Sequence, residues 1–361
     1  MRQSCATVCV KGRAMIDAHG SAPKADSSVS ASPDGAIDWP RFVDHVRRHR
    51  RFLLTTHIRP DCDALGSTLA MAALLEQLGK QVMIVTAFDV PRTFQFLDPR
   101  KRFQRYGRDV SLGDLAGIEA LVVLDTSAWA QLGEMGEVIR ALPVVKLVLD
   151  HHVTSDDLGA ELFRDTEAEA TGRLVFEAAG HLGVPLNAET ATCLFAALAT
   201  DTGWFRFASA SSRTYRLASV LIDAGAVPAR LYQALYENDS AGRLRLMGRA
   251  MARVQLECQG RLIHTYLSQA DFAECGAVPS DSEDIINTTL SVGGTEVAVM
   301  LVEQPSGGFK VSFRSRSGVD CAAVAAQFGG GGHRAAAGAF LAEPLDCAQR
   351  KVLDAVRAAM E

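Results

Sequence analysis

The sequence lacks the features of membrane, secreted and zinc-ribbon proteins. Its 361 residues contain no apolar run near the roughly 18 residues of a membrane-spanning helix. The N-terminus lacks the basic-then-apolar order of a secretory signal. The eight cysteines are scattered and form no CxxC pair, which argues against a disulfide framework and a structural zinc site. We therefore expect a cytoplasmic protein with reduced thiols and no membrane contact.

The chain also has little net charge. Its formal charge is -5, with 22% charged and 48% hydrophobic residues, which is typical of a globular protein with a full core. A large surface for long duplex nucleic acid is therefore not expected, whereas a local site for a small anionic substrate is compatible with this balance.

The length indicates about two domains. Residues 1–36 are rich in Ser, Ala, Asp, Pro and Gly without any period, which predicts a disordered tail, and Met1 and Met15 both remain candidate starts. After this tail we expect a first domain over 37–226, a helical linker over 227–250 and a smaller domain over 251–361.

The first domain is predicted to be α/β. Strands are expected at 51–55, 81–86, 120–124 and 144–149, and helices at 40–50, 64–78, 188–199 and 209–224. Such near-continuous apolar strands between helices indicate a parallel sheet with helices on both faces. Thr166 to Glu169 matches a capping box for a further helix. The basic stretch 92–108 is interpreted as a connecting segment, or alternatively as a lip that attracts phosphates.

The C-terminal part is predicted to be a smaller α+β domain. Strands are expected at 260–266, 296–302 and 309–313, and helices at 322–328 and 345–360. Between them lies the stretch GGGGHRAAAG, residues 329–338.

Imidazoles and carboxylates follow the predicted strands of the first domain. His57, Asp61 and Asp63 come after the first strand, Asp125 after the third and His151 after the fourth. The carboxyl ends of parallel strands meet at one edge of the sheet, so these side chains can converge there. Asp201, at the turn after the helix 188–199, is a sixth candidate.

These side chains indicate a metal site. Four crowded carboxylates would repel one another unless cations lay between them. A set of carboxylates and imidazoles without thiolate suits Mn²⁺ better than structural zinc, and two ions suit hydrolysis of a phosphate ester. Each residue alone has a plainer explanation: Asp61 and Asp63 as helix caps, Asp125 as a turn residue and His151 as packing. Their common position at strand ends and turns is harder to explain in that way.

The motifs HIRPDCDALGS, VVLDTS, LDHH and ATDTGWF, in this order, resemble the four motifs of the DHH phosphoesterase superfamily. The stretch GGGGHRAAAG resembles the signature of its C-terminal DHHA1 domain. Together the five motifs cover residues 38 to about 345. This resemblance makes 37–226 the catalytic DHH domain and 251–361 the substrate-binding DHHA1 domain.

The resemblance also implies the role of each residue. One ion would be held by His57, Asp61 and Asp125, and the other by Asp63, Asp125, His151 and Asp201, with Asp125 as the bridge. His152 would contact the substrate phosphate or the attacking water, and Asp150 would orient an imidazole from behind. Cys62 departs from the family, where glycine or alanine is commoner, and its thiol is expected to point away from the metals.

The DHHA1 domain is expected to bind the substrate. Gly329 to Gly332 would let the backbone approach a phosphate or base and leave N–H groups free for an anion, so Gly330, Gly331 and Gly332 are candidate contacts. Arg314 and His333 are candidates for holding a terminal phosphate, with Arg316 as the alternative to Arg314. We expect this domain to close over the metal site.

The architecture resembles the stand-alone oligoribonuclease (nano-RNase) type, which also dephosphorylates 3′-phosphoadenosine 5′-phosphate. The predicted substrates are short single-stranded RNA or that nucleotide bisphosphate, hydrolysed without a covalent enzyme intermediate. A phosphodiesterase for linear or cyclic dinucleotides is the alternative enzyme, and a nucleotide-binding regulator without catalysis is the alternative from another class. The sequence leaves open the native metal, the direction of digestion and the quaternary state, for which a homodimer is one arrangement.

Overall fold

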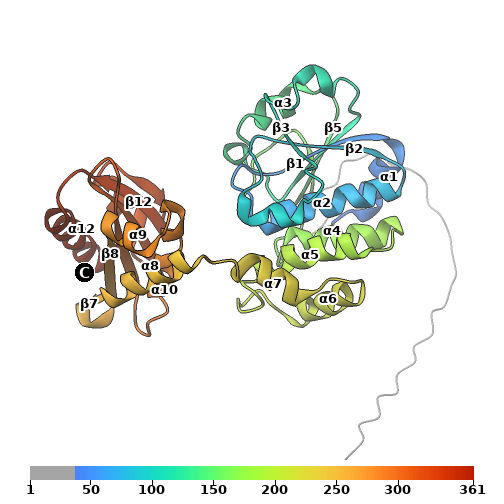
Figure 1. Cartoon of the computed structure of the whole chain (residues 1–361). Coiled ribbons are helices and arrows are strands. Elements are labelled where there is room, and N and C mark those ends of the chain that lie inside the picture. Colours follow the sequence, from blue (N-terminus) through green and yellow to red (C-terminus); the bar gives the residue numbers. More distant parts are fainter. Residues whose placement is uncertain (1–36) are drawn as a thin grey trace, which may run out of the picture. The chain divides into compact units, whose positions relative to one another are not determined.

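The structure, a computed structural model, describes residues 37–361. The tail predicted for residues 1–36 lies outside these residues. The described chain divides into two compact units: 37–91 with 97–226, and 92–96 with 227–361 (Figure 1). None of its helices combines the length and the apolar character that crossing a bilayer would take.

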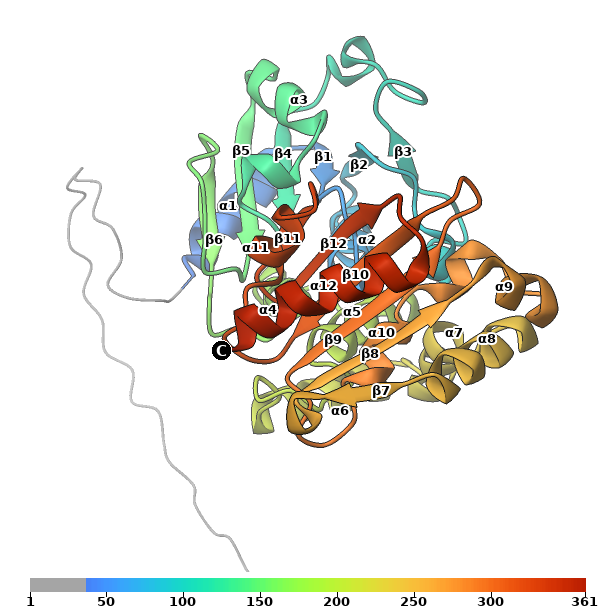
Figure 2. The same cartoon turned by 90° about the vertical axis from the view of Figure 1, so that its left-hand side faces the viewer.

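The first unit is built on a six-stranded parallel sheet (Figure 2). The strand order is β3 (Phe103–Arg105), β2 (Gln81–Thr86), β1 (Arg51–Thr55), β4 (Ala120–Leu124), β5 (Val145–Asp150) and β6 (Glu161–Arg164). The order reverses between β1 and β4. In an open parallel sheet, such a reversal leaves a crevice at the carboxyl ends of the two strands, and ligands bind there.

Helices cover both faces of this sheet, as predicted. The helices of the unit are α1 (Trp39–Arg48), α2 (Cys62–Gln77), α3 (Met135–Ala141), α4 (Thr171–Leu182), α5 (Ala188–Asp201) and α6 (Ser212–Asp223), with short 3-10 turns η2 (Leu112–Leu115) and η3 (Trp129–Gln131). The 3-10 turn η1 (Arg92–Leu97) belongs, except for Leu97, to the second unit. Helix α3 packs on one face, where Val138 and Ile139 join Leu53 and Leu121 in the core. Helix α2 packs on the other face, between the sheet and α5.

Local sequence explains where most of these helices begin. The side chain of Asn187 accepts a hydrogen bond from the backbone of Thr190, which caps α5 as predicted. The capping box predicted at Thr166 to Glu169 is wrong. Helix α4 begins at Thr171, after Ala170, and its first N–H groups donate to a distant carboxylate instead of a local cap.

The second unit contains a six-stranded mixed sheet between helices. The strand order is β11 (Gly331–His333), β12 (Ala336–Leu341), β10 (Phe309–Ser315), β9 (Val297–Glu303), β8 (Leu262–Leu267) and β7 (Gln255–Glu257). Its helices are α7 (Pro228–Tyr236), α8 (Ala241–Ala252), α9 (Gln269–Cys275), α10 (Ile285–Thr289), α11 (Cys321–Ala326) and α12 (Leu345–Met360), with short turns η4 (Cys258–Gly260) and η5 (Pro279–Ser282). Helices α11 and α12 cover one face and α8, α9 and α10 the other.

The stretch GGGGHRAAAG folds as a hairpin and not as an open loop. Gly331 to His333 form β11 and pair with β12. The expectation that all four glycines leave their N–H groups free is wrong for two of them. Gly329 and Gly330 donate to carbonyl groups of α11, because the chain must close the end of that helix before it enters the strand.

The sequence did not predict strands β3, β6, β7, β11 and β12. Strands β3, β6, β7 and β11 have only three or four residues, and each of them ends a sheet, whereas β12 has six residues and lies next to β11. Short strands at a sheet edge carry few buried apolar side chains, so the periodic signal is weak.

Candidate metal centre

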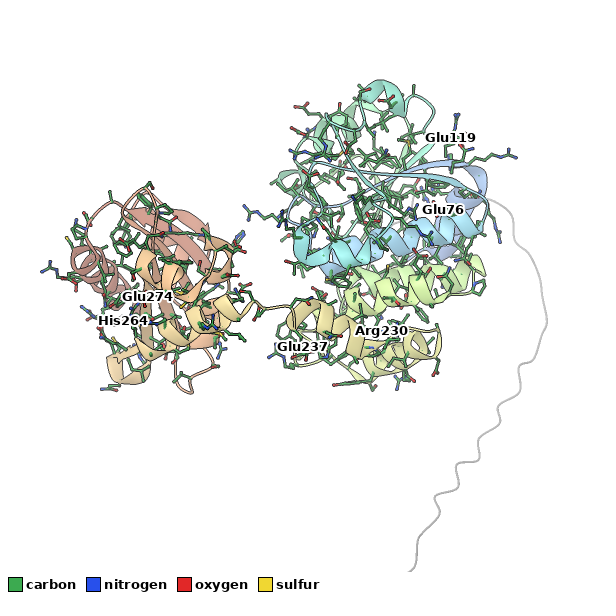
Figure 3. All side chains as sticks on the ribbon, viewed as in Figure 1. Glu76, Glu119, Arg230, Glu237, His264 and Glu274 are labelled. Atoms are coloured by element: carbon green, nitrogen blue, oxygen red, sulfur yellow. The ribbon has the colours of Figure 1, made fainter. Side chains whose placement is uncertain are left out.

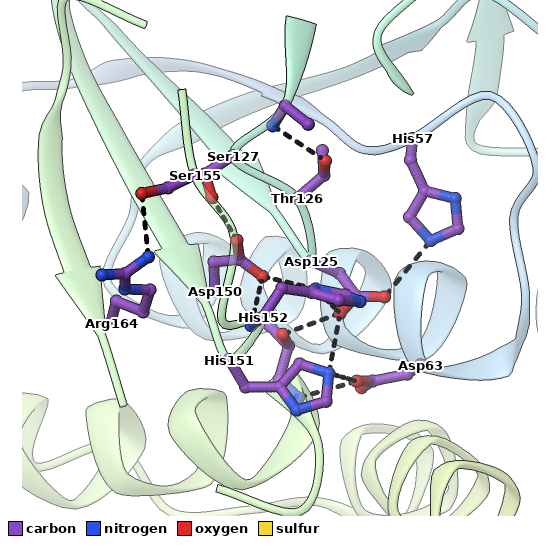
Figure 4. Close-up of polar contacts among 12 residues, drawn as sticks. His57, Asp63, Asp125, Thr126, Ser127, Asp150, His151, His152, Ser155 and Arg164 are labelled. Carbon is purple, nitrogen blue, oxygen red and sulfur yellow. Dashed lines mark hydrogen bonds and ion pairs between the residues drawn. The ribbon is translucent and has the colours of Figure 1, made fainter. Parts of the chain in front are cut away.

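Three neighbouring strands deliver side chains to the crevice of the first sheet. His57 lies two residues beyond β1, Asp125 directly follows β4, and His151 directly follows β5. Strands β1, β4 and β5 are adjacent in the sheet, so these groups lie side by side at its carboxyl edge (Figure 4).

Helix α2 supplies two carboxylates. Asp61 is the N-cap, and its Oδ1 accepts a hydrogen bond of 3.0 Å from the backbone N of Ala64. Asp63 lies inside the first turn and is 1% exposed. Asp61 can therefore cap the helix and bind a metal ion at the same time, because the cap uses only one of its two carboxylate oxygens.

Helix α4 holds these carboxylates from the other side. The backbone N–H groups of Thr171 and Gly172 donate to Asp63 over 2.6 and 2.8 Å. The hydroxyl of Thr171 donates to Oδ1 of Asp125 over 2.9 Å. The N-terminus of α4 thus directs its partial positive charge at buried acids. Sequence analysis missed Thr171, because nothing local marks a contact more than 100 residues away.

The two histidines face the carboxylates. His57 Nε2 lies 3.3 Å from Oδ2 of Asp125. His151 Nδ1 lies 3.0 Å from the carbonyl oxygen of Ala168 and therefore donates to it. That bond leaves His151 Nε2 as the ring nitrogen with the lone pair, directed at the carboxylates.

His151 Nε2 is close to three carboxylates. It lies 3.8 Å from Oδ2 of Asp63, 3.6 Å from Oδ1 of Asp125 and 3.5 Å from Oδ2 of Asp201. Asp201 is the last residue of α5 and not part of a turn as predicted. The end of that helix brings its carboxylate to the same edge.

Asp150 and His152 form a separate pair beside this cluster. Oδ1 of Asp150 accepts a hydrogen bond of 2.8 Å from His152 Nδ1, and Oδ2 accepts one of 2.6 Å from the hydroxyl of Ser127. Burial would raise the pKa of Asp150, but these bonds outweigh it and lower the pKa. The hydrogen bond that His152 donates to Asp150 raises the pKa of His152, whose side chain is 51% exposed.

Too little positive charge lies near the carboxylates of Asp63, Asp125 and Asp201 to balance their negative charge. Burial, reinforced by neighbouring aspartates, raises the pKa of Asp125 well above its ordinary value and raises that of Asp63. Burial and the nearby Asp63 raise the pKa of Asp201 to about 7. Burial lowers the pKa of His57 and favours its neutral, metal-binding form.

The donor set fits divalent cations. Ligand atoms gather in three groups: His57 with Asp61 and Asp125, Asp63 with His151 and Asp201, and Asp125 with His151 and His152. All six predicted ligands belong to these groups, and Asp125 and His151 each belong to two. Cations would remove the repulsion that raises the carboxylate pKa values. Cys62, buried next to two of the aspartates, belongs to none of the groups found in the described part of the chain.

The predicted substrate residues of the second unit share one face of its sheet. Arg314 pairs with Ala336, and His333 pairs with the same residue from the other side. Cross-strand partners point to the same face, so both side chains project from it together. The side chains of Lys310, Ser312 and Arg314 line a pocket of about 270 Å³ on this face.

Comparison with known proteins gives two family matches. The DHH family, N-terminal domain, matches residues 51–198, and the DHHA1 domain matches residues 260–361. The chain is 33% identical, over 90% of its length and 97% of the relative, to the bifunctional oligoribonuclease and PAP phosphatase NrnA of Thermus thermophilus. It is 25% identical to the protein of the same name from Bacillus subtilis, over 83% and 92% of the two chains.

A solved structure is also similar. An exopolyphosphatase-related protein from Bacteroides fragilis superimposes with a TM-score of 0.79 at 25% identity, covering 89% of this chain and 95% of that one. The two-domain architecture is thus shared over nearly the whole described length.

Proposed function

We propose, since the chain belongs to the DHH family and ends in a DHHA1 domain, that it hydrolyses short single-stranded oligoribonucleotides to 5′-mononucleotides. We further propose that it removes the 3′-phosphate of 3′-phosphoadenosine 5′-phosphate. The relatives named oligoribonuclease and PAP phosphatase span nearly the full chain, which supports both activities. It is a hydrolase in either case.

The cluster of buried carboxylates is the observation that carries this proposal. Asp63 and Asp125 are almost completely buried, and no arginine or lysine pairs with either of them in the described chain. Buried acids without a counter-charge cost free energy, which a pair of cations would offset. The carboxylate and imidazole donors favour Mn²⁺.

The proposed ligands follow the three groups of ligand atoms, except that Asp125 is added to the second set because its Oδ1 lies 3.6 Å from Nε2 of His151. His57, Asp61 and Asp125 would hold one ion, and Asp63, Asp125, His151 and Asp201 the other. When bound, such ions lower the pKa of water and neutralise charge that develops on phosphoryl oxygens.

His152 is proposed to bind the scissile phosphate. Its bond to Asp150 fixes the ring and favours the protonated form. A half-exposed imidazolium at the rim of the carboxylate cluster can donate a charge-assisted hydrogen bond to a phosphate oxygen. Asp150 itself positions the ring and makes no contact with substrate.

The shared face of the second unit is proposed to hold the rest of the substrate. Arg314 and His333 offer donors for a terminal phosphate, and Lys310, Glu283 and Asp284 line the pocket beside Arg314. Gly331 has open space at the place of a side chain, so its backbone can approach a ligand. Gly330 and Gly332 act indirectly, because a side chain on either would collide with β12.

Turnover by purified protein tests the proposal. The protein would be incubated with Mn²⁺ and, in parallel, with labelled diribonucleotide, longer RNA, 3′-phosphoadenosine 5′-phosphate and inorganic pyrophosphate. We expect cleavage of the dinucleotide to 5′-mononucleotides and release of phosphate from the bisphosphate. Turnover of pyrophosphate alone would contradict the proposed substrate class.

A further inference from the structure

A basic pocket lies at the amino-terminal ends of the strands of the first sheet, opposite the carboxyl ends that carry the metal centre. It has a volume of about 820 Å³ and is lined by Arg47, Arg48, Arg50, Arg51, Lys80 and Glu119, among others. Five cationic side chains thus face one carboxylate, in a chain whose formal net charge is -5.

The topology of the sheet gathers these cations. Arginines 47, 48, 50 and 51 run from the last turn of α1 into the start of β1. The backbone N of Gln81, at the start of β2, donates to the carbonyl of Arg50, and the backbone N of Glu119, just before β4, donates to that of Arg51. Three strand starts therefore meet here, and Glu119, labelled in Figure 3, marks this edge.

Two of the cations have a structural role. The ammonium of Lys80 donates to the carbonyl oxygens of Arg47 and His49, over 3.3 and 2.8 Å, and so satisfies the end of α1. Arg48 pairs with Asp44 on the same helix at 2.8 Å. These contacts account for Lys80 and Arg48 without a ligand.

The remaining positively charged side chains of the pocket, three arginines, outnumber its single carboxylate. Glu119 lies 3.5 Å from Arg51, and it also accepts hydrogen bonds from the backbone N–H groups of Arg50 and Arg51. The bond from Arg50 lowers the pKa of Glu119. The guanidinium groups of Arg47 and Arg50 are exposed and make no ion pair or side-chain hydrogen bond within residues 37–361.

We propose that this pocket binds backbone phosphates of single-stranded RNA, away from the metal centre. Guanidinium groups bind phosphate oxygens bidentately. The pocket lies at the start of β1 and the metal centre beyond its end, about 17 Å away for a strand of this length. A phosphate bound in this pocket is therefore not the phosphate whose ester bond is cleaved at the metal centre.

The lining favours RNA over other anions. Leu78, 38% exposed, is its one large apolar side chain, and no aromatic residue lines it. A protein partner would need an apolar or aromatic centre, and a small nucleotide would need walls for its base. The phosphates of a strand can be held by separated cations such as those of the pocket, through the electrostatic and sequence-independent part of nucleic-acid binding.

The test uses full-length, Mn²⁺-loaded protein and a fluorescent phosphorothioate RNA of about 20 nucleotides, which keeps the charge and resists hydrolysis. Excess unlabelled phosphorothioate dinucleotide, which also resists hydrolysis, occupies the metal centre. Anisotropy gives the affinity over a range of salt concentrations. The double variant Arg47→Gln with Arg50→Gln loses two phosphate contacts. The magnitude of the slope of log K against log salt should therefore decrease by about 1.4, and the affinity should fall by about tenfold at physiological salt.

The matched control is Arg216→Gln with Arg230→Gln, two exposed arginines on α6 and α7 that also have no ion pair in the described chain. It should bind RNA as the unaltered protein does, and both double variants should keep full turnover of dinucleotide. Unchanged affinity in the first variant, or an equal loss in the control, overturns the proposal. Equally tight binding of polyglutamate, or displacement of the RNA by stoichiometric tripolyphosphate, overturns it too. Because binding and turnover are separate readouts, failure here leaves the proposed hydrolysis untouched.

Discussion

At the scale of single residues, Asp125 carries the most unusual conformation of the site. Its φ of 62° lies in the left-handed region, which aspartate and asparagine tolerate better than most residues. Its carboxylate is 2% exposed and lies between His57 and His151. Both the backbone strain and the buried charge cost free energy, and such costs collect at functional sites.

Replacing Asp125 by asparagine distinguishes the effect of the buried charge on stability from its effect on turnover. Asparagine keeps the size and the left-handed tolerance but removes the charge. We expect turnover of dinucleotide to fall by more than the roughly 10–100-fold that follows loss of an outer metal partner. We also expect the melting temperature in EDTA to rise, because no charge is buried. Asp223→Asn, at the exposed end of α6, is the control and should change neither; substantial residual turnover in Asp125→Asn would exclude a bridging role.

The raised pKa of Asp201 predicts how the stability of the metal-free protein depends on pH. Its pKa of about 7 exceeds the ordinary value near 4 that it would have in the unfolded chain. Between these values the folded state binds more protons, so the free energy of unfolding falls as pH rises and levels off above about 7. Melting temperatures in EDTA should therefore fall from about pH 5 to about pH 8, and less steeply in Asp201→Asn.

Metal should reverse this trend. Ligand carboxylates must lose their protons to bind a cation, so the rise in melting temperature on adding Mn²⁺ should grow with pH. A metal-free profile that rises with pH in the unaltered protein would contradict the inferred shift of Asp201.

At the scale of elements, the start of α4 organises the site. Its first two N–H groups bind Asp63, and Gly172 packs tightly against α5. A Cβ at Gly172 would lie 2.7 Å from the Cβ of Ala197 and 3.4 Å from Oδ1 of Asp63. This glycine is therefore required by close packing and not by its own backbone angles.

Two glycines in α4 give a matched comparison. We expect Gly172→Ala to push α4 away from α5, lower the melting temperature and weaken Mn²⁺ binding measured by calorimetry. Gly180→Ala, eight residues on, meets open space and should stabilise the protein by about 0.5–1 kcal/mol, as alanine does in a helix. Equal Mn²⁺ affinity in both variants would show that the packing of α4 does not shape the metal centre.

At the scale of the whole molecule, the candidate metal ligands and the proposed binding residues for a terminal phosphate lie in different units. The candidate metal ligands all lie in the first unit, whereas Arg314 and His333 lie in the second. Removing donors from the second unit should therefore affect substrate binding and leave metal binding unchanged.

Kinetics of Arg314→Ala and His333→Ala test this division. Loss of one hydrogen bond to a charged phosphate costs about 1.5–3 kcal/mol, which corresponds to roughly a tenfold to hundredfold rise in KM. The Mn²⁺ affinity should not change. Arg350→Ala, on the exposed side of α12, removes an equal charge from the other face of the sheet and should leave KM unaltered. Weakened Mn²⁺ binding without a change in KM would reverse the assignment.

The sequence by itself determined the apolar strands, most helices and the identity of the candidate ligands. Strands β1, β2 and β4 begin and end where predicted, because their apolar runs are unbroken and are followed by polar residues or turns. The order of motifs placed His57, Asp125 and His151 after the first, third and fourth predicted strands, and the parallel sheet brings them to one edge.

Only the tertiary structure decided which distant groups hold those ligands. Thr171 reaches Asp63 and Asp125, and the carbonyl of Ala168 fixes the ring of His151, although none of these pairs is marked by a local pattern. Periodicity reports which face of an element is buried, but not which neighbour covers it. Hydrogen bonds between elements depend on how helices pack across the sheet, and that packing is a property of the folded chain as a whole.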